Sequence, residues 1–312
     1  MGAAWVAGTV RARALLSRRV GAVAARRLAG LGSVDAVIRE LGDGPYGRDL
    51  RPGLSSAQVE TVIGATLLWQ MRVLAGWSPG PGVRTMRLLA AWFEIVNTVD
   101  HARSLAGAQA PSDRVVDPYR LGALATAWPR LAATTSLSGL RAELARTLWG
   151  DPGAEEPAAV AIGMAVACAA RVAEQVPRVA ELAAGAVALQ VARERFLTGR
   201  ALTEQVRRRA EPLLGSRAMA ADDLDGFAEG LRPAARWALG DLAGPDALPR
   251  AETAWWRRVE RDAASLVAGA GFGQETTVGC VAALAADARR VRAAVQFAAM
   301  GDTRLELFDA AF

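Results

Sequence analysis

The sequence predicts an all-α protein built from three similar helical lobes. Of its 312 residues, 52% are hydrophobic, and much of this share is alanine and leucine, which are strong helix formers. Strand signals are scarce, because there is no Asn-Gly hairpin turn and β-branched residues seldom alternate with polar ones. An apolar helix with a polar centre also recurs along the chain, at 88–103, 187–197 and 281–292.

The centres of the three copies are Asn97, Arg195 and Arg290, which lie 98 and 95 residues apart. A repeat of this period predicts three superposable lobes related by pseudo-threefold symmetry, at 1–108, 109–204 and 205–312. Polar groups in the middle of an apolar helix need partners, because a buried polar group without one costs about 1–3 kcal/mol. The residues concerned are Glu94, Asn97, Arg193, Arg195 and Arg290.

Glycine and proline divide the chain into helical segments. The early helices are expected to end at 42–45, and Ser55 with Gln58 forms a capping box that opens the next helix. A turn at 78–82 then precedes the helix at 88–103.

The remaining glycine- and proline-rich turns separate the second and third lobes. A joint at 107–113 ends the first lobe, the turn at 150–153 breaks the second, and alanine-rich helices follow at about 155–176 and 179–200. The third lobe starts near Thr203. It contains a loop at 240–249, a helix through Trp255 and Trp256, a helix-to-helix loop at 269–273 and a last helix pair.

The residue types exclude several kinds of chemistry. The sequence has no lysine, which rules out a lysine Schiff base and a P-loop. His101 is its single histidine, too few for a histidine-rich metal site. Cys168 and Cys280 lie in apolar runs and are expected to be buried thiols in a reducing cytoplasm. We therefore expect no catalytic residue, no cofactor and no metal.

The net charge of +5 comes from the first 34 residues, which hold six arginines and no acid. Such a segment could bind an anionic lipid surface or nucleic acid, and it is also similar to a mitochondrial transit peptide. Nucleic acid is disfavoured because no aromatic residues interleave with the arginines. The favoured interpretation is a solvated helix that packs on the core through Val10, Leu15, Leu16, Val20 and Val23. The longest apolar run, 158–170, is too short to span a membrane.

An acidic cluster offers one enzymatic alternative. Asp222, Asp223 and Asp225, extended by Glu229, could hold Mg²⁺ against a diphosphate, as in all-α isoprenoid synthases. The competing interpretation is that these acids start a helix, where acids act as caps and favour the helix dipole.

Three segments, in their order along the chain, resemble a known family. They are 5–16 with Trp5, Arg11 and Arg13; 38–50 with Tyr46, Gly47 and Leu50; and 93–97 with Phe93, Glu94 and Asn97. This order is similar to the C/d family of V/A-type (vacuolar-type) rotary ATPases, the stalk-to-ring adaptors of bacteria, archaea and eukaryotes. The sequence departs from the family pattern at Trp5, usually tyrosine, at Thr9, usually arginine, and at Glu94, which lies three rather than four residues before Asn97.

The resemblance implies a non-catalytic adaptor made of three pseudo-symmetric helical lobes that form a funnel. Such an adaptor sits at the cytoplasmic face of the membrane, on the proteolipid ring, and the central stalk enters it. The resemblance suits ATP synthesis and ATP hydrolysis equally, and H⁺ and Na⁺ equally. The alternatives are the Mg²⁺-dependent synthase and a generic helical interaction protein.

Overall fold

The computed structural model describes residues 3–108, 117–240, 242–269, 271–302 and 304–312. It confirms the all-α prediction: the structure is 73% helical, and the described residues contain no strand. The predicted joint at 107–113 falls largely on residues outside the described part of the chain.

The chain forms two compact units, which are described separately. In described residues, unit 1 comprises 3–86, 117–120 and 259–312, and unit 2 comprises 87–108 and 121–258. The helices α5 (Gly80–Leu105) and α14 (Leu248–Ala268) contribute residues to both. The three predicted lobes follow from the sequence repeat, whereas the two units follow from contacts within the folded chain. The lobes stay a prediction.

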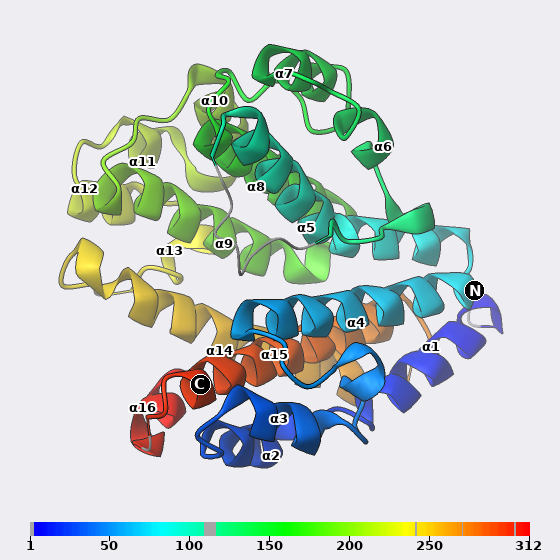
Figure 1. Ribbon diagram of the computed structural model, residues 1–312. Helices are drawn as coiled ribbons and strands as arrows, with labels where there is room; N and C mark the ends of the chain where they lie inside the picture. The colour runs from blue at the N-terminus through cyan, green and yellow to red at the C-terminus, as the bar shows by residue number, and fades with distance from the viewer. Residues whose placement is uncertain (1–2, 109–116, 241, 270, 303) are drawn as a thin grey trace. The chain divides into compact units, whose positions relative to one another are not determined.

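Unit 1 is organised around the long helix α15 (Gln274–Ala299), drawn in orange-red in Figure 1. It packs against α1 (Ala3–Leu16), α2 (Gly21–Ala29), α3 (Val34–Leu41) and α4 (Ser56–Gly76). A 3-10 turn, η1 (Gly47–Asp49), follows α3, and α16 (Leu305–Ala310) packs on α2.

Unit 2 is organised around α8 (Pro157–Gln175) and α9 (Ala180–Ala192), which pack against each other. A π-helical turn, η5 (Arg193–Leu197), extends α9. The shorter elements are η3 (Gly122–Leu124), α6 (Trp128–Leu131), α7 (Leu137–Ala145), η4 (Pro177–Val179), α10 (Glu204–Leu214), α11 (Ser216–Ala220), α12 (Leu224–Gly230), α13 (Pro233–Arg236) and η6 (Pro245–Ala247).

The start of α4 is as the sequence predicts. The Ser55 side chain accepts a hydrogen bond from the Gln58 backbone, and the Gln58 side chain accepts one from the Ser55 backbone. The predicted turn at 78–82 is shorter in the structure, because α5 already begins at Gly80. Pro81 fits there because the first N–H groups of a helix have no partner within it.

The predicted buried face of the first helix is correct only in part: Leu16 is buried and Leu15 and Val20 are half-buried, but the two remaining residues are exposed. Residues 3–29 form two helices, and Val10 and Val23 are 54% and 87% exposed. The face of α1 that packs on the core carries Leu16 together with Gly8, Thr9 and Ala12, which the prediction did not include. Small residues occupy the contact because they allow helix axes to approach closely, so the largest apolar side chains do not mark the buried face here.

Helix α8 corrects the expectation that no segment is long enough to cross a membrane. At 19 residues and a mean hydropathy of 1.4, it is the one described helix that meets this test of length and composition. A core helix that is buried on two sides is also apolar all round. In α8, Ile162 and Val166 belong to one hydrophobic cluster of unit 2, and Val160 and Met164 belong to another.

Candidate functional site

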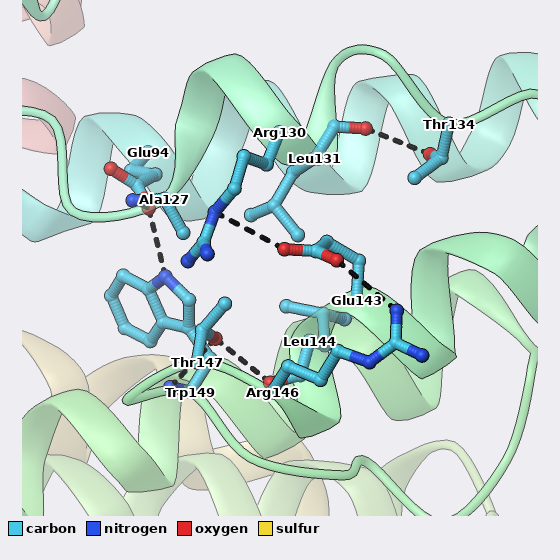
Figure 2. A network of polar contacts seen from close by, with 10 residues as sticks. All are labelled: Glu94, Ala127, Arg130, Leu131, Thr134, Glu143, Leu144, Arg146, Thr147 and Trp149. Carbon is cyan, nitrogen blue, oxygen red and sulfur yellow. Dashed lines mark hydrogen bonds and ion pairs between the residues drawn. The ribbon is translucent and has the colours of Figure 1, made fainter.

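Glu94, in the middle of α5, is a buried carboxylate with three hydrogen-bond donors. Its side chain is 1% exposed. Oε2 accepts a hydrogen bond from the backbone N–H of Thr126 (2.6 Å), and Oε1 accepts from the backbone N–H of Ala127 (2.8 Å). Oε1 also accepts from the indole Nε1–H of Trp149 (2.8 Å), as Figure 2 shows. Glu94 therefore fixes the start of α6 and the turn after α7 on α5.

Neighbouring ion pairs hold α6 and α7 together beside this site. Arg130 of α6 pairs with Glu143 of α7 (3.1 Å), and Glu143 also lies 3.8 Å from Arg146 (Figure 2). Both arginines are largely exposed, so these pairs contribute little compared with the buried contacts of Glu94.

Asp287, on α15, is a second buried carboxylate that accepts two backbone N–H groups and one aromatic side-chain donor. It is 2% exposed. Its oxygens accept hydrogen bonds from the backbone N–H groups of Val20 (3.1 Å) and Gly21 (2.7 Å), at the start of α2. The third donor is the hydroxyl of Tyr46 (3.0 Å). Asp287 thus holds α2 and the turn after α3 on α15.

The two carboxylates occupy equivalent places in the chain. Glu94 lies three residues before Asn97, and Asp287 lies three residues before Arg290. Each accepts two successive backbone N–H groups at the start of a short helix and one N–H or O–H from an aromatic side chain. The likeness concerns contacts as well as sequence spacing.

Three other short helices, α3, α7 and α12, share a capping pattern. Ser33 caps α3, Ser136 caps α7 and Asp223 caps α12, each accepting the backbone N–H three residues later. The residues four and eight positions after each cap are buried apolar side chains: Val37 and Leu41, Leu140 and Leu144, and Phe227 and Leu231. Three helices with little sequence identity are therefore capped and buried in the same register.

An aromatic residue completes each of these segments. Tyr46 and Trp149 each lie thirteen residues after their cap, and Trp237 lies fourteen after its cap. Tyr46 and Trp149 are 1% and 0% exposed and donate to the two carboxylates. A long helix begins soon after each aromatic residue, at Ser56, Pro157 and Leu248.

A glycine follows two of the aromatic residues for steric and conformational reasons. A Cβ atom at Gly47 would collide with the backbone carbonyls of Gly42 and Leu41. Gly150, after Trp149, has a φ of +70°, a conformation that favours glycine. The Tyr46-Gly47 pair of the family-like segment is thus explained by a buried hydrogen bond and a close backbone approach.

In the third segment, no buried carboxylate occurs among the residues that the structure describes, and the segment is held differently. Arg195, on the π-helical turn after α9, donates a hydrogen bond to the carbonyl of Ala221 and lies over the rings of Phe196 and Phe227. Burial lowers the pKa of Arg195 from its ordinary value. The ring of Trp237 lies against Gly185 of α9 and stacks under the guanidinium of Arg258 (4.1 Å).

The other predicted residues of unit 1 make separate contacts. The ring of Trp5 lies against Gly82 at the start of α5. Arg11 lies over Trp77 (5.6 Å), and Arg13 donates to the carbonyl of Gly269 (2.7 Å). Leu50 is buried, and Arg290 pairs with Glu260 (2.5 Å).

In unit 2, Phe93 and Asn97 are buried beside Glu94 on α5. Arg193 is exposed and pairs with Glu252 (2.7 Å). All the predicted polar centres therefore interact with other residues of the chain. They are Glu94, Asn97, Arg193, Arg195 and Arg290.

Sequence reasoning missed Asp287 and Trp149 as site residues. Asp287 lies in the third copy of the recurring helix, at 281–292, and Trp149 is one of nine tryptophans in the sequence. The signal that could have found Trp149 is its distance from Ser136, which equals the distance of Tyr46 from Ser33.

The acidic cluster is built as a helix start. Asp223 is the N-cap of α12 and accepts the backbone N–H of Gly226 (2.7 Å). Only Asp225 lies on the helix, so the three aspartates do not share one helical face as the synthase alternative requires. Within the described ranges, no group of three or more His, Cys, Asp or Glu side chains is placed to hold a metal ion.

Asp223→Ala should lower the free energy of unfolding by about 0.5–2 kcal/mol, the usual cost of losing an N-cap. Asp222→Ala, one residue before the cap, should change it by less than about 0.5 kcal/mol. Urea denaturation followed by circular dichroism measures both. Equal effects of the two substitutions would contradict the assignment of the cap.

The Tyr46 hydroxyl should stay protonated in the folded protein at high pH. Burial raises the pKa of Tyr46 well above its ordinary value, and the Asp287 carboxylate raises it further. A raised pKa means that the stabilisation is complete below the unfolded pKa, about 10, and is lost as the pH rises through the folded value. In a Tyr119→Phe background, phenolate absorbance should therefore appear together with unfolding; its appearance in a chain that is still folded near pH 10 would contradict this.

No protein-family model matches the sequence, and no curated protein matches it either.

Proposed function

We propose that the chain consists of three copies of one structural unit. Each copy contains a capped short helix, an aromatic turn and a pair of long helices. The long pairs are α4 with α5, α8 with α9, and α14 with α15. The support for this proposal is the common register of the caps Ser33, Ser136 and Asp223 with the buried side chains and aromatic residues that follow them.

The long helix that ends one copy contacts the short segment of the next. Glu94 on α5 binds the start of α6, and Asp287 on α15 binds the start of α2. Arg195 after α9 binds Ala221, which directly follows α11 and lies three residues before α12. The contact of Asp287 leads from the last copy back to the first. Such a cyclic order supports three lobes with pseudo-threefold symmetry, at 1–108, 109–204 and 205–312.

We further propose that the protein is a non-catalytic adaptor that couples the central stalk of a V/A-type rotary ATPase to its proteolipid ring. The observation that carries this proposal is the role of the family-like segments. Tyr46 and Glu94 belong to two of these segments. The hydrogen bond from Tyr46 to Asp287 is equivalent to the one from Trp149 to Glu94, and the two bonds lie in different copies. Segments that resemble a three-lobed adaptor thus lie at the places where a repeated architecture needs them.

The physical character of the chain suits this role. An adaptor that transmits torque must resist deformation, and closely packed interiors have low compressibility. The core helices α8, α9 and α15 present alanine, glycine and valine to their neighbours. In this proposal the protein lies in the cytoplasm, peripherally attached to the membrane through the ring.

The proposal is tested by tagging the chromosomal copy in the native host and purifying the complex in mild detergent. We expect the chain to co-purify with a proteolipid and with central stalk proteins, and the isolated chain to hydrolyse no ATP. Unimpaired ATP-driven ion pumping by this complex after deletion of the gene would refute the coupling role.

A parallel assay addresses the synthase alternative. The purified chain is incubated with prenyl diphosphates and Mg²⁺, and diphosphate release is measured. We expect none; release that disappears in the Asp222→Asn, Asp223→Asn double variant would replace the adaptor proposal with an enzymatic one. Co-purification with soluble partners alone would favour a generic helical interaction protein.

A further inference from the structure

The outward face of α1 is apolar, although the helix lies at the surface of unit 1. Val6, Ala7, Val10 and Ala14 are all exposed, and their spacing places them on one face of the helix. Val6 and Val10 are 39% and 54% exposed. The opposite face, with Ala12 and Leu16, packs on the core. A surface helix normally carries polar residues on its outer face, so this face of α1 is unusual.

An arginine and an exposed aromatic ring lie on each side of this apolar face. Arg11 lies over Trp77 (5.6 Å), and Arg13 lies over Phe272 (5.9 Å). Arg11 and Arg13 are two positions apart on the helix, which places them on opposite flanks of the stripe. Trp77 and Phe272 are 54% and 42% exposed.

The charge around this face has one sign. Arg18 and Arg19 are exposed just after α1, and no acid occurs before Asp35. Glu275 is the only acid within five residues of either aromatic residue in the sequence. The surface therefore combines an apolar stripe, aromatic edges and a net positive charge.

We propose that the outward face of α1 binds the headgroup region of an anionic lipid bilayer. Apolar side chains enter the boundary between headgroups and acyl chains, tryptophan favours that depth, and arginine pairs with lipid phosphate. An acidic protein partner would match the arginines, but it would not need the exposed valine stripe between them. The inference is independent of the adaptor role, because lipid vesicles contain no ATPase component.

The test is co-sedimentation of the purified full chain with vesicles of equal parts phosphatidylglycerol and phosphatidylcholine, at low salt and at physiological salt. We expect binding that weakens as salt rises, and much weaker binding to vesicles of phosphatidylcholine alone. Val10→Glu should lower the affinity at least about tenfold, and Arg11→Gln about fivefold.

The chain provides matched controls for both substitutions. Val23→Glu makes the same change at a valine of α2 that is 87% exposed, and Arg48→Gln removes another arginine that lies over an exposed tryptophan, Trp69. Both should keep the affinity within about twofold, the range of an ordinary surface substitution.

Three results would overturn the proposal. They are no binding to anionic vesicles at low salt, equal binding to both kinds of vesicle, and a loss for Val23→Glu as large as for Val10→Glu. If the chain did not bind vesicles and Val10→Glu abolished co-purification of another protein, the face would be a protein interface. Failure of the ATPase pull-down with vesicle binding intact would reject only the adaptor role.

Discussion

Glu94→Ala should lower the free energy of unfolding by about 3–5 kcal/mol, because it leaves three donors without an acceptor. The donors are the backbone N–H groups of Thr126 and Ala127 and the indole N–H of Trp149. A buried donor that loses its acceptor costs about 1–3 kcal/mol, and some of this is recovered where water enters the space left by the side chain. Urea denaturation of the purified chain measures the loss.

A graded series keeps this prediction testable if the alanine variant does not fold. Glu94→Gln retains one carbonyl acceptor and should cost roughly half as much. Glu174→Ala, at an exposed glutamate of α8, serves as the control and should cost less than about 0.5 kcal/mol. A double-mutant cycle of Glu94→Gln with Trp149→Phe should show coupling, since the two side chains share a hydrogen bond. Additive effects would show that this bond contributes nothing to stability.

Asp287→Ala should cost about 2–4 kcal/mol and should loosen α2 before the rest of unit 1. The carboxylate accepts the backbone N–H groups of Val20 and Gly21, so its loss frees the first turn of α2. It also removes the acceptor of the buried Tyr46 hydroxyl. Hydrogen exchange followed by mass spectrometry should show faster exchange in 21–29 than in the wild type, while α4 keeps its protection.

Tyr46→Phe provides the partial version of the same change. It removes the hydroxyl but leaves both backbone contacts of Asp287 in place, so we expect a loss of about 0.5–1.5 kcal/mol. Asp43→Ala, at an exposed aspartate in the turn after α3, is the control. If Asp287→Ala and Asp43→Ala were equally mild, Asp287 would not be what holds α2 on α15.

The equivalence of Glu94 and Asp287 bears on how the chain is put together. In each case a long helix stabilises the start of a short one, over a separation of 32 and 33 residues for Glu94 and of 266 and 267 for Asp287. The Asp287 contact therefore links the two ends of the sequence within unit 1.

Local features of this protein follow from the sequence alone. The capping box of Ser55 and Gln58 and the cap at Asp223 depend on side chains that bond to backbone a few residues away. The same holds for the all-helical class, since the helix propensity of alanine and leucine is local and adds up along the chain. The sequence also indicates that Glu94 needs a partner, because a carboxylate inside an apolar helix cannot remain unpaired.

Which partner it takes was decided only by the tertiary structure. Nothing near Glu94 in the sequence indicates Trp149, and nothing near Asp287 indicates Tyr46, because these pairs meet only when separate segments pack. The buried face of α1 was decided in the same way: close packing selected Gly8 and Ala12 and left Val10 exposed. The sequence by itself thus determined the helices, their caps and the need for buried partners, whereas packing between distant segments determined the partners and the buried faces. The reason is that backbone caps act over a few residues, while burial depends on the shape of surfaces that exist only in the folded chain.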